Sequence, residues 1–186
     1  MRTGILFFCV FIYGIPLMNK PSIAIYPGSF DPITLGHLDI MERASRIFDK
    51  LIVGIGVNLE KKHLFTTEER IEQIKLSTQH LPNVEIRTFN GLAVRFVEEC
   101  GANIMIRGVR PITDIPAELT MMMANRRLSS NVETLFMIAD GDLAHVSSSL
   151  IKQIAGLAGR EEFRKFLPEV VIPFVEAKFQ KTDPDR

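Results

Sequence analysis

SIAIYPGSFDPITLGH, the stretch from Ser22 to His37, joins an expected strand at 23–26 to an expected helix through a turn rich in Gly and Pro. The strand is short and β-branched, whereas apolar residues recur at helical spacing from Leu38 to Phe48. A strand that passes through such a turn into an amphipathic helix is one βα unit. We therefore expect parallel strands, with helices packed on them, from this point onward.

Short β-branched runs and amphipathic stretches alternate through the rest of the chain. Four more strands are expected, at 51–57, 84–88, 104–106 and 133–138. Thr66 followed by Glu69 has the spacing of a capping box and predicts the start of the second crossover helix. Right-handed crossovers then predict an α/β fold, a doubly wound, Rossmann-like sheet of five parallel strands ordered 3-2-1-4-5. C-terminal helices follow it, and Pro173 should kink or restart the last one.

Short runs that contain glycine, serine, lysine or arginine follow four of the expected strands. In a sheet of this order, ligands bind beyond the carboxyl ends of strands 1 and 4. The residues concerned are PGSFD at 27–31, Lys61 and Lys62, RGVR at 107–110, and Ser147, Ser148 and Ser149. Their shared placement at strand ends predicts that they meet in one site.

The overall composition excludes several classes of protein. The chain has 186 residues, with 22 Lys and Arg against 22 Asp and Glu, so it has no global positive charge with which to hold a nucleic acid. Its two cysteines, Cys9 and Cys100, are too few and too far apart for a disulfide scaffold or a structural zinc site. We therefore expect a cytoplasmic protein with neither nucleic-acid nor membrane partners.

Residues 1–17 differ from the rest, because Ile5 to Tyr13 is an unbroken apolar run. The run is similar to the apolar region of a secretory signal, but no small-residue cleavage site follows it. It is also shorter than the roughly 20 residues that span a bilayer. Met18 stands just before the first expected strand. We expect residues 1–17 to be an apolar leader that translation from an upstream start codon adds, and residues 18–186 to form a single domain.

The segment Thr34-Leu35-Gly36-His37 opens the first helix directly after the turn. Gly36 allows a close approach of the backbone, the helix N-terminus supplies unpaired N–H groups, and His37 adds an imidazole donor. Together these features predict a phosphate site. Taken alone, His37 is more simply a helix-terminal residue that the backbone satisfies. Neither GxGxxG nor GxxxxGK[ST] occurs, since Leu59 stands where the first motif needs Gly.

The other polar groups each have a structural and a functional interpretation. Arg107 and Arg110 could be surface charges, but guanidinium groups beyond a buried strand suit bidentate phosphate binding. Lys61 is less specific, because loop lysines are usually solvated, and Ser147 could cap a helix while also donating to a triphosphate. No hydrolytic motif such as GxSxG or HExxH accompanies them. A site with many possible phosphate ligands and no hydrolytic motif favours phosphoryl or nucleotidyl transfer, in which positioning and charge neutralisation supply most of the rate.

Three motifs resemble those of bacterial phosphopantetheine adenylyltransferases, members of the nucleotidylyltransferase superfamily. They are AIYPGSFDPITLGH at 24–37, IRGVR at 106–110 and VSSSLIK at 146–152. TLGH and SSS are shared by the wider superfamily, whereas PGSFDPIT together with RGVR is typical of this member. The resemblance implies one nucleotidylyltransferase domain over 18–186. It also implies transfer of AMP from ATP to 4′-phosphopantetheine, giving dephospho-coenzyme A and pyrophosphate in coenzyme A biosynthesis.

The resemblance implies roles for individual residues, with His37 as the catalytic residue that acts on the phosphates during transfer. The residues implied to bind ATP are Ser29, Phe30, His37, Gly108, Val109, Arg110, Glu118, Ser147, Ser148 and Ser149. Those implied to bind phosphopantetheine are Ser29, Lys61, Ala93 and Arg107. Mg²⁺ would arrive bound to ATP, without dedicated protein ligands. The family also implies a homo-oligomer, a hexamer, and residues 121–123, all Met, are expected in the core or at a subunit contact.

Two segments depart from the family pattern. Pro116 precedes Glu118 where the family has an aromatic and acidic run, so the following helix is expected to begin differently. The segment 140–145 lacks the aromatic residue often found beside adenine. Two alternatives stay open: a nucleotidylyltransferase for nicotinate mononucleotide or glycerol 3-phosphate, and a catalytically silent nucleotide-binding protein. RGVR and Lys61 disfavour the first, and intact His37 and Arg110 disfavour the second.

Overall fold

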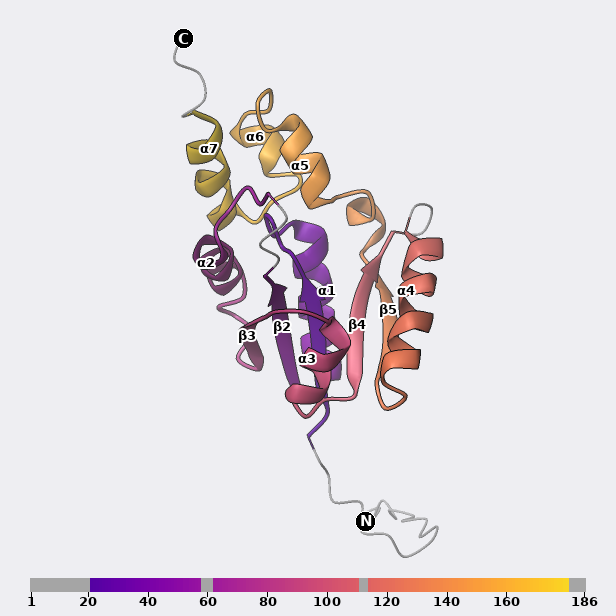
Figure 1. The fold of residues 1–186 in the computed structure, drawn as a ribbon. Coiled ribbons are helices and arrows are strands. Elements are labelled where there is room, and N and C mark those ends of the chain that lie inside the picture. The colour runs from indigo at the N-terminus through magenta and orange to yellow at the C-terminus, as the bar shows by residue number, and fades with distance from the viewer. Residues whose placement is uncertain (1–20, 58–61, 111–113, 181–186) are drawn as a thin grey trace, which may run out of the picture.

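The computed structural model describes residues 21–57, 62–110 and 114–180. Five parallel strands form one sheet in the order β3-β2-β1-β4-β5, which is the predicted order (Figure 1). The strands are β1 (Ile23–Gly28), β2 (Lys50–Gly56), β3 (Val84–Phe89), β4 (Ile104–Val109) and β5 (Glu133–Ile138). The predicted doubly wound α/β fold is confirmed.

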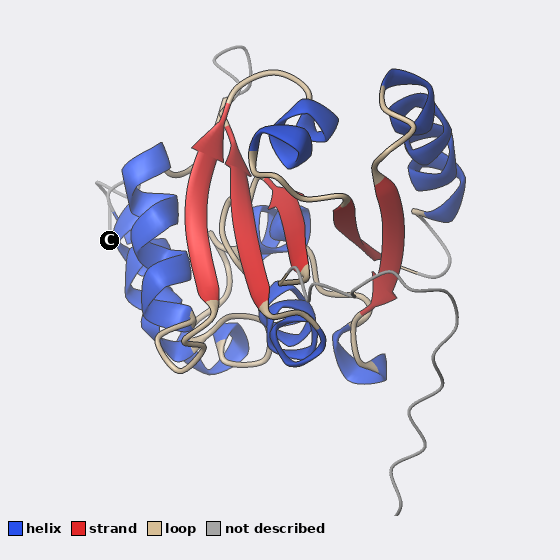
Figure 2. Ribbon diagram, turned by 90° about the horizontal axis from the view of Figure 1, so that it is seen from below, coloured by secondary structure: helices blue, strands red, loops and turns tan. Residues whose placement is uncertain are grey.

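Helices lie on both sides of the sheet (Figure 2). Four of them join consecutive strands, namely α1 (Leu35–Ile47), α2 (Thr67–Ser77), α3 (Ala93–Glu99) and α4 (Ile115–Leu128). After β5 the chain forms η1 (Gly141–Leu143), α5 (Ser148–Ile154), α6 (Arg160–Phe163), η2 (Glu169–Val171) and α7 (Ile172–Gln180). The helices α5, α6 and α7 lie beyond the carboxyl end of the sheet, as Figure 1 shows.

Alternation along the strands divides the apolar core into two clusters. Ala24 and Tyr26 point to one face, where they pack with Met41 of α1 and with apolar residues of α2 and the C-terminal helices. Ile25 points to the other face, where it packs with Phe96 of α3. Successive side chains of a strand lie on opposite faces, so a fully buried parallel strand is apolar at every position.

Two predictions about helix ends are confirmed. Thr66 and Glu69 form the expected capping box, in which the Thr66 hydroxyl accepts from Glu69 N–H at 3.2 Å and the Glu69 carboxylate accepts from Thr66 N–H at 2.8 Å. Pro173 restarts the helix, since it is the second residue of α7 directly after η2. Proline is tolerated there because the first turn needs no N–H donor.

The pairing of β1 with its two neighbours is unequal. β1 is in register with β2 over its whole length, from Ile23 opposite Lys50 to Gly28 opposite Ile55. It pairs with β4 at Ala24 and Ile25 alone. The two strands therefore separate toward their carboxyl ends, at the point where the strand order reverses and where ligands are expected.

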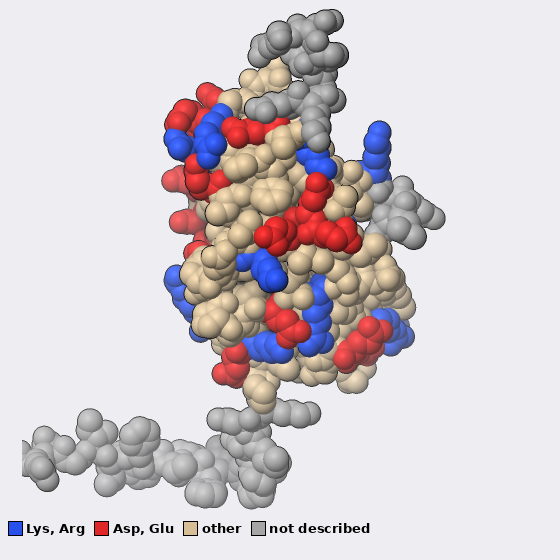
Figure 3. Space-filling view, turned by 90° about the vertical axis from the view of Figure 1, so that its left-hand side faces the viewer, with Lys and Arg blue, Asp and Glu red and all other residues tan. Residues whose placement is uncertain are grey.

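The surface charges on one face and the apolar character of the helices can be described directly. On the face that carries α2 and α7, acidic and basic side chains are intermixed and no continuous basic surface forms (Figure 3). No helix within residues 21–57, 62–110 and 114–180 combines the length and the apolar character that crossing a bilayer requires.

Candidate active site

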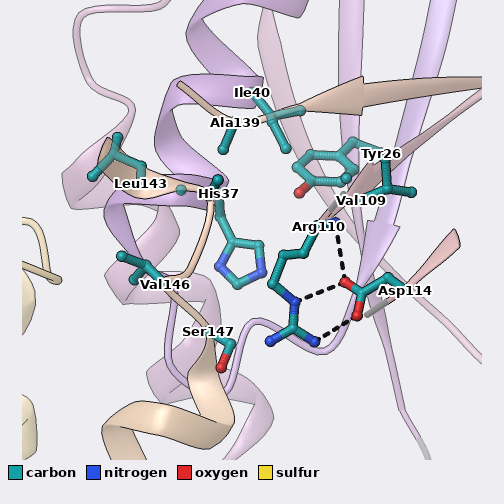
Figure 4. A pocket seen from close by; sticks show the side chains of 13 residues that line it. Tyr26, His37, Ile40, Val109, Arg110, Asp114, Ala139, Leu143, Val146 and Ser147 are labelled. Atoms are coloured by element: carbon teal, nitrogen blue, oxygen red, sulfur yellow. Dashed lines mark hydrogen bonds and ion pairs between the residues drawn. The ribbon is translucent and has the colours of Figure 1, made fainter. Parts of the chain in front are cut away.

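Two cavities lie at the carboxyl end of the sheet, one on each side of the separation between β1 and β4. The His37 pocket, about 150 Å³, lies among the start of α1, the end of β4 and the segment 139–147 (Figure 4). The Ser29 pocket, about 230 Å³, lies among the ends of β1, β2 and β3 and the start of α3. Both cavities therefore lie at the edge of the sheet where the strand order predicted a ligand site.

The two pockets divide the expected site residues. Those that line the His37 pocket are His37, Gly108, Val109, Arg110 and Ser147. Those that line the Ser29 pocket are Ser29, Ala93 and Arg107. Four others, Phe30, Glu118, Ser148 and Ser149, line neither pocket. Lys61 lies outside the described residues.

His37 has a structural role and faces the pocket at the same time. It is the third residue of α1, and its Nδ1 accepts the N–H of the N-cap residue Thr34 at 3.1 Å and lies 2.9 Å from the Thr34 hydroxyl. Because Nδ1 accepts from a backbone N–H, it carries no proton, and the neutral ring must carry its proton on Nε2. The capping box thus sets the tautomer and leaves Nε2–H as a donor.

Burial and a neighbouring cation keep His37 neutral. Burial, together with the positive charge of nearby Arg110, lowers the pKa of His37 from its usual value of 6.5 to about 4. In Figure 4 the imidazole lies between Arg110 and Val146 in the pocket. At neutral pH the ring is therefore an uncharged hydrogen-bond donor beside a guanidinium.

Phe30 supports His37 from inside the protein. Its ring is buried and meets the His37 ring edge-on, with the centroids 5.1 Å apart. The residue has a φ of 46°, which is rare for a side chain of this size. A Cβ added at Gly28 would lie 2.8 Å from the Phe30 ring, so only glycine leaves room for this turn. Phe30 thus fixes the imidazole from behind.

Arg110 is held by a carboxylate. Its guanidinium donates two hydrogen bonds to Asp114, from Nε at 2.7 Å and from Nη2 at 2.8 Å, and these bonds raise the pKa of Arg110. Asp114 is the N-cap residue of α4 but makes no side-chain cap, because its carboxylate also accepts the Arg110 N–H. Pro116 is the second residue of α4, which begins at Ile115. Sequence reasoning did not single out Asp114, although its spacing from Arg110 was a usable signal.

Arg107 is also held by a carboxylate, that of Glu118, which lies one helical turn after Asp114. Its Nε and Nη2 donate to the Glu118 carboxylate at 2.8 and 2.6 Å, and Nη1 donates to the Pro27 carbonyl at 3.1 Å. The hydrogen bonds to Glu118 raise the pKa of Arg107. Glu118 therefore faces a residue of the Ser29 pocket, whereas the family resemblance associates it with ATP. Both site arginines are bound by carboxylates of the α4 region.

Gly108 separates the two arginines and allows a close approach of the backbone. A Cβ at this position would lie 2.6 Å from Cδ1 of Ile40 and 2.8 Å from the Tyr26 hydroxyl. Tyr26 is itself buried, and burial raises the pKa of its hydroxyl above the usual value. No side chain other than hydrogen fits at Gly108 without displacing these two residues.

The three serines after β5 point in different directions. Ser147 is the N-cap of α5, where its hydroxyl accepts the Leu150 N–H at 3.1 Å, and it also lines the His37 pocket. Ser148 donates to the Pro32 carbonyl at 2.7 Å, and Ser149 is exposed. The capping role expected for Ser147 is therefore present.

The burial of two charged residues was not predicted from the sequence. Arg70 is 1% exposed and donates to the Ser29 carbonyl at 2.9 Å, so it fixes the turn after β1. Asp31 is also 1% exposed and accepts from Leu64 N–H, Phe65 N–H and the Lys152 ammonium group. Asp31 ends the PGSFD segment and Arg70 lies four residues after the helix cap Thr66, but no spacing rule predicts that a charged side chain at either position turns inward.

The residues present fit a metal that enters with a nucleotide. Within the described part of the chain, no three side chains of His, Cys, Asp or Glu lie close enough together to hold a metal ion. Mg²⁺ is usually bound by phosphate oxygens, water and only one or two protein carboxylates. The mainly donor groups of the His37 pocket suit the phosphates rather than the ion.

Comparisons with known proteins place this chain in a family. The cytidylyltransferase-like family model matches residues 25–154. A phosphopantetheine adenylyltransferase from Rhodopirellula baltica is 58% identical over 158 residues, which cover 84% of this chain and 88% of the relative. The chain belongs to the phosphopantetheine adenylyltransferase family. Two further members are similar, from Clostridium botulinum at 49% identity, covering 74% of this chain and 86% of the relative, and from Finegoldia magna at 41%, covering 87% and 98%.

A solved structure shares the fold. It is that of a protein from Vibrio parahaemolyticus assigned as a nicotinate-nucleotide adenylyltransferase, with a TM-score of 0.59 and 14% identity, covering 87% of this chain and 93% of that one. At this identity the likeness concerns the fold alone. Membership of the phosphopantetheine adenylyltransferase family rests on the close sequence relatives.

Proposed function

We propose that this chain transfers the adenylyl group of ATP to the phosphate of 4′-phosphopantetheine and releases pyrophosphate. The observation that carries the proposal is the pair of adjacent pockets, one with His37 and Arg110 and the other with Arg107, on a chain of this family. An oxygen of the acceptor phosphate bonds to the α-phosphorus of ATP while the bond from that phosphorus to pyrophosphate breaks. The acceptor is already an anion, so no general base is needed.

His37 supplies a preorganised hydrogen-bond donor for this step. The capping box with Thr34 fixes the ring, and Nε2–H is free to donate to the α-phosphate, where negative charge develops in the transition state. A pKa of about 4 means that the donor is present across the neutral pH range and that no proton has to be transferred. We assign His37 the catalytic role on this basis.

The two arginines are proposed to bind different substrates. Arg110 lines the His37 pocket and would neutralise the triphosphate, whereas Arg107 lines the Ser29 pocket and would bind the phosphate of phosphopantetheine. Asp114 and Glu118 hold the guanidinium groups in place before substrates arrive. Lys61, Ser29 and Ala93 complete the proposed acceptor site, and Ser147, Gly108 and Val109 the proposed nucleotide site. Phe30, Glu118 and Ser148 would support these residues through the His37 ring, the Arg107 guanidinium and the Pro32 carbonyl, whereas the exposed Ser149 stays a proposed ATP-binding residue.

Mg²⁺ is proposed to enter with ATP. When bound, the ion neutralises phosphate charge and assists the departure of pyrophosphate. Arg110 and His37 would then contact the oxygens that the ion leaves free.

The test is pyrophosphate release from ATP with a panel of phosphorylated acceptors. We expect Mg²⁺-dependent turnover with 4′-phosphopantetheine and formation of dephospho-coenzyme A. Equal or greater turnover with nicotinate mononucleotide or glycerol 3-phosphate would favour another nucleotidylyltransferase. ATP binding without turnover for any acceptor would favour the silent nucleotide-binding protein.

A homo-oligomer is proposed, with the number of six subunits taken from the family resemblance, and exposed apolar residues of α4 and β5 support a subunit contact there. The interpretation of 121–123 as core is wrong for the isolated chain, because Met121 and Met123 are 54% and 58% exposed. Contiguous apolar surface of this kind marks contact sites between proteins. The exposed apolar residues of these elements are Ile115, Leu119, Met121, Met123, Leu128, Leu135 and Ile138. Light scattering after gel filtration measures the molar mass of the assembly and so tests the number of subunits.

Residues 1–17 are proposed to be dispensable, and the enzyme to act in the cytoplasm. The leader lies outside the described residues, and β1 begins only at Ile23. We expect a chain that starts at Met18 to be soluble, fully active and no less stable than the long form. A native N-terminus upstream of Met18, found by mass spectrometry, would show instead that the leader belongs to the protein.

A further inference from the structure

Asp31 joins three segments of the chain that are distant in sequence. It lies in the turn between β1 and α1 and is 1% exposed. One carboxylate oxygen accepts the Phe65 N–H at 2.9 Å, and the other accepts the Leu64 N–H at 3.0 Å and the Lys152 ammonium group at 2.6 Å. His63 Nδ1 lies 3.6 Å from the same oxygen. A single buried carboxylate thus holds the turn, the segment 62–65 and α5 together.

Each joined segment carries part of a substrate pocket. The turn leads to His37, which lines the His37 pocket, and α5 follows Ser147, which lines the same pocket from the opposite side. The segment 62–65 contains His63, which lines the Ser29 pocket. Ser148 adds a second link between α5 and the turn by donating to the Pro32 carbonyl at 2.7 Å. The spacing between the walls of both pockets therefore depends on contacts to the turn.

We propose that Asp31 and Lys152 are positioning residues of the reaction: their ion pair sets the distance between Ser147 and His37 for nucleotide binding, while the same carboxylate sets the segment 62–65 beside the acceptor pocket. The inference rests on the proposed function, because it assigns the two pockets to the two substrates. Neither residue lines either pocket, so both act through others.

The energetics favour positioning over stability as the reason for this pair. The Asp31 carboxylate is 1% exposed and loses its hydration, whereas the Lys152 side chain is 39% exposed, so their attraction is weakened by solvent and does little more than offset that loss. Burial alone would raise the pKa of Asp31, but the hydrogen bonds from Lys152, Leu64 and Phe65 outweigh it and hold the pKa below its usual range. The carboxylate is consequently charged at neutral pH and can hold all of these donors together.

The roles of the two partners differ, and this difference makes the inference testable. Lys152 bonds to the Asp31 oxygen that also accepts the Leu64 N–H, so its loss should weaken the link to α5, where the bond from Ser148 still holds the turn, and leave both backbone bonds to the segment 62–65 in place. Asp31 also accepts hydrogen bonds from the N–H groups of Leu64 and Phe65. An Asn at position 31 would place an NH₂ donor against groups that are themselves donors, namely the two N–H groups and the Lys152 ammonium. Contacts to both the segment 62–65 and α5 should therefore weaken, and both pockets should be affected.

The experiment compares Lys152→Met and Asp31→Asn with the wild type and with Lys165→Met, which removes an exposed lysine outside both pockets. We expect Lys152→Met to raise the KM for ATP by about tenfold and that for 4′-phosphopantetheine less than twofold, because small misplacements of binding groups cost this much. Asp31→Asn should raise both KM values. Lys152→Arg should return the ATP KM to within about threefold of wild type. Thermal melting identifies any variant that fails to fold.

Calorimetry with ATP alone separates failure of this inference from failure of the proposed function. If the wild type makes no dephospho-coenzyme A, the proposed function fails, while weaker ATP binding by Lys152→Met still supports the positioning role. If the wild type is active and Lys152→Met changes neither KM, or changes both equally, the positioning role is overturned. Unchanged acceptor KM in Asp31→Asn would overturn the part that concerns the segment 62–65.

Discussion

Replacing His37 with Ala should affect stability and catalysis to different extents. The substitution removes the acceptor of the Thr34 N–H, a helix-cap bond of 3.1 Å, which is worth about 1 kcal/mol of unfolding free energy. For a chain of this size, that corresponds to a melting temperature lower by roughly 2–4 °C. It also removes the Nε2–H donor, and loss of one preorganised donor costs about 10²–10³ in kcat.

A second variant separates these two effects. The capping box of α2 uses Glu69 at the position that His37 occupies in α1. His37→Glu should therefore restore the cap and the melting temperature, but it supplies no hydrogen-bond donor to the phosphate. We expect kcat, measured at saturating ATP by pyrophosphate release, to stay at least about 10²-fold below wild type in both variants.

Two results would refute this reasoning. If His37→Ala kept kcat within about threefold of wild type, the imidazole would make no contact specific to the transition state. If His37→Glu recovered the wild-type kcat, the residue would contribute through helix capping alone. A collapse of equilibrium ATP binding with unchanged kcat would make His37 a binding residue.

Other predictions concern pH, packing and substrate selectivity. Because the pKa of His37 falls from 6.5 to about 4 on folding, the unfolded state binds more protons between these values, so stability should fall as the pH drops through this range, by at most about 3 kcal/mol. Melting curves between pH 7 and 4.5 check this, and His37→Ala should lose less over the same range. Gly108→Ala should cost about 1–3 kcal/mol in denaturant unfolding and raise the KM for ATP, whereas Gly141→Ala, with open space around its Cβ, should do neither. Arg107→Ala should raise the KM mainly for phosphopantetheine and Arg110→Ala mainly for ATP, and steady-state kinetics that showed both acting on ATP alone would contradict the assignment of Arg107.

The fold could be predicted from local patterns because each pattern has one structural outcome. β-branched runs bounded by Gly and Pro form the five strands, and handed crossovers then leave few possible orders. Thr66 with Glu69 marked a helix start, since a capping box depends only on residues three apart. The exposure of Met121 and Met123 was not predictable in the same way, because an apolar helical face looks the same whether a sheet or another subunit covers it.

The candidate site was predictable in outline but not in its contacts. His37 stood out because it opens a helix and Arg110 because it follows a strand, and both line one pocket. The partner of Arg107 is Glu118, eleven residues away, and the partner of Asp31, in the turn after β1, is Lys152 of α5. Such pairings depend on the three-dimensional course of the chain. Residue type and local spacing do not encode them.

Because β1 separates early from β4, the sheet has two parts, β1 to β3 and β4 to β5, which we call the first and second leaf. The leaf built from β1, β2 and β3 forms most of the Ser29 pocket, although Arg107 of β4 also lines it. The end of β4, the segment beyond β5 and the start of α1 line the His37 pocket. Acceptor preference can therefore change through replacements along the first leaf while the machinery that handles the nucleotide stays intact. An engineer who wishes to adenylylate a different phosphate ester should redesign the surroundings of Ala93 and Phe89 and leave the second leaf untouched.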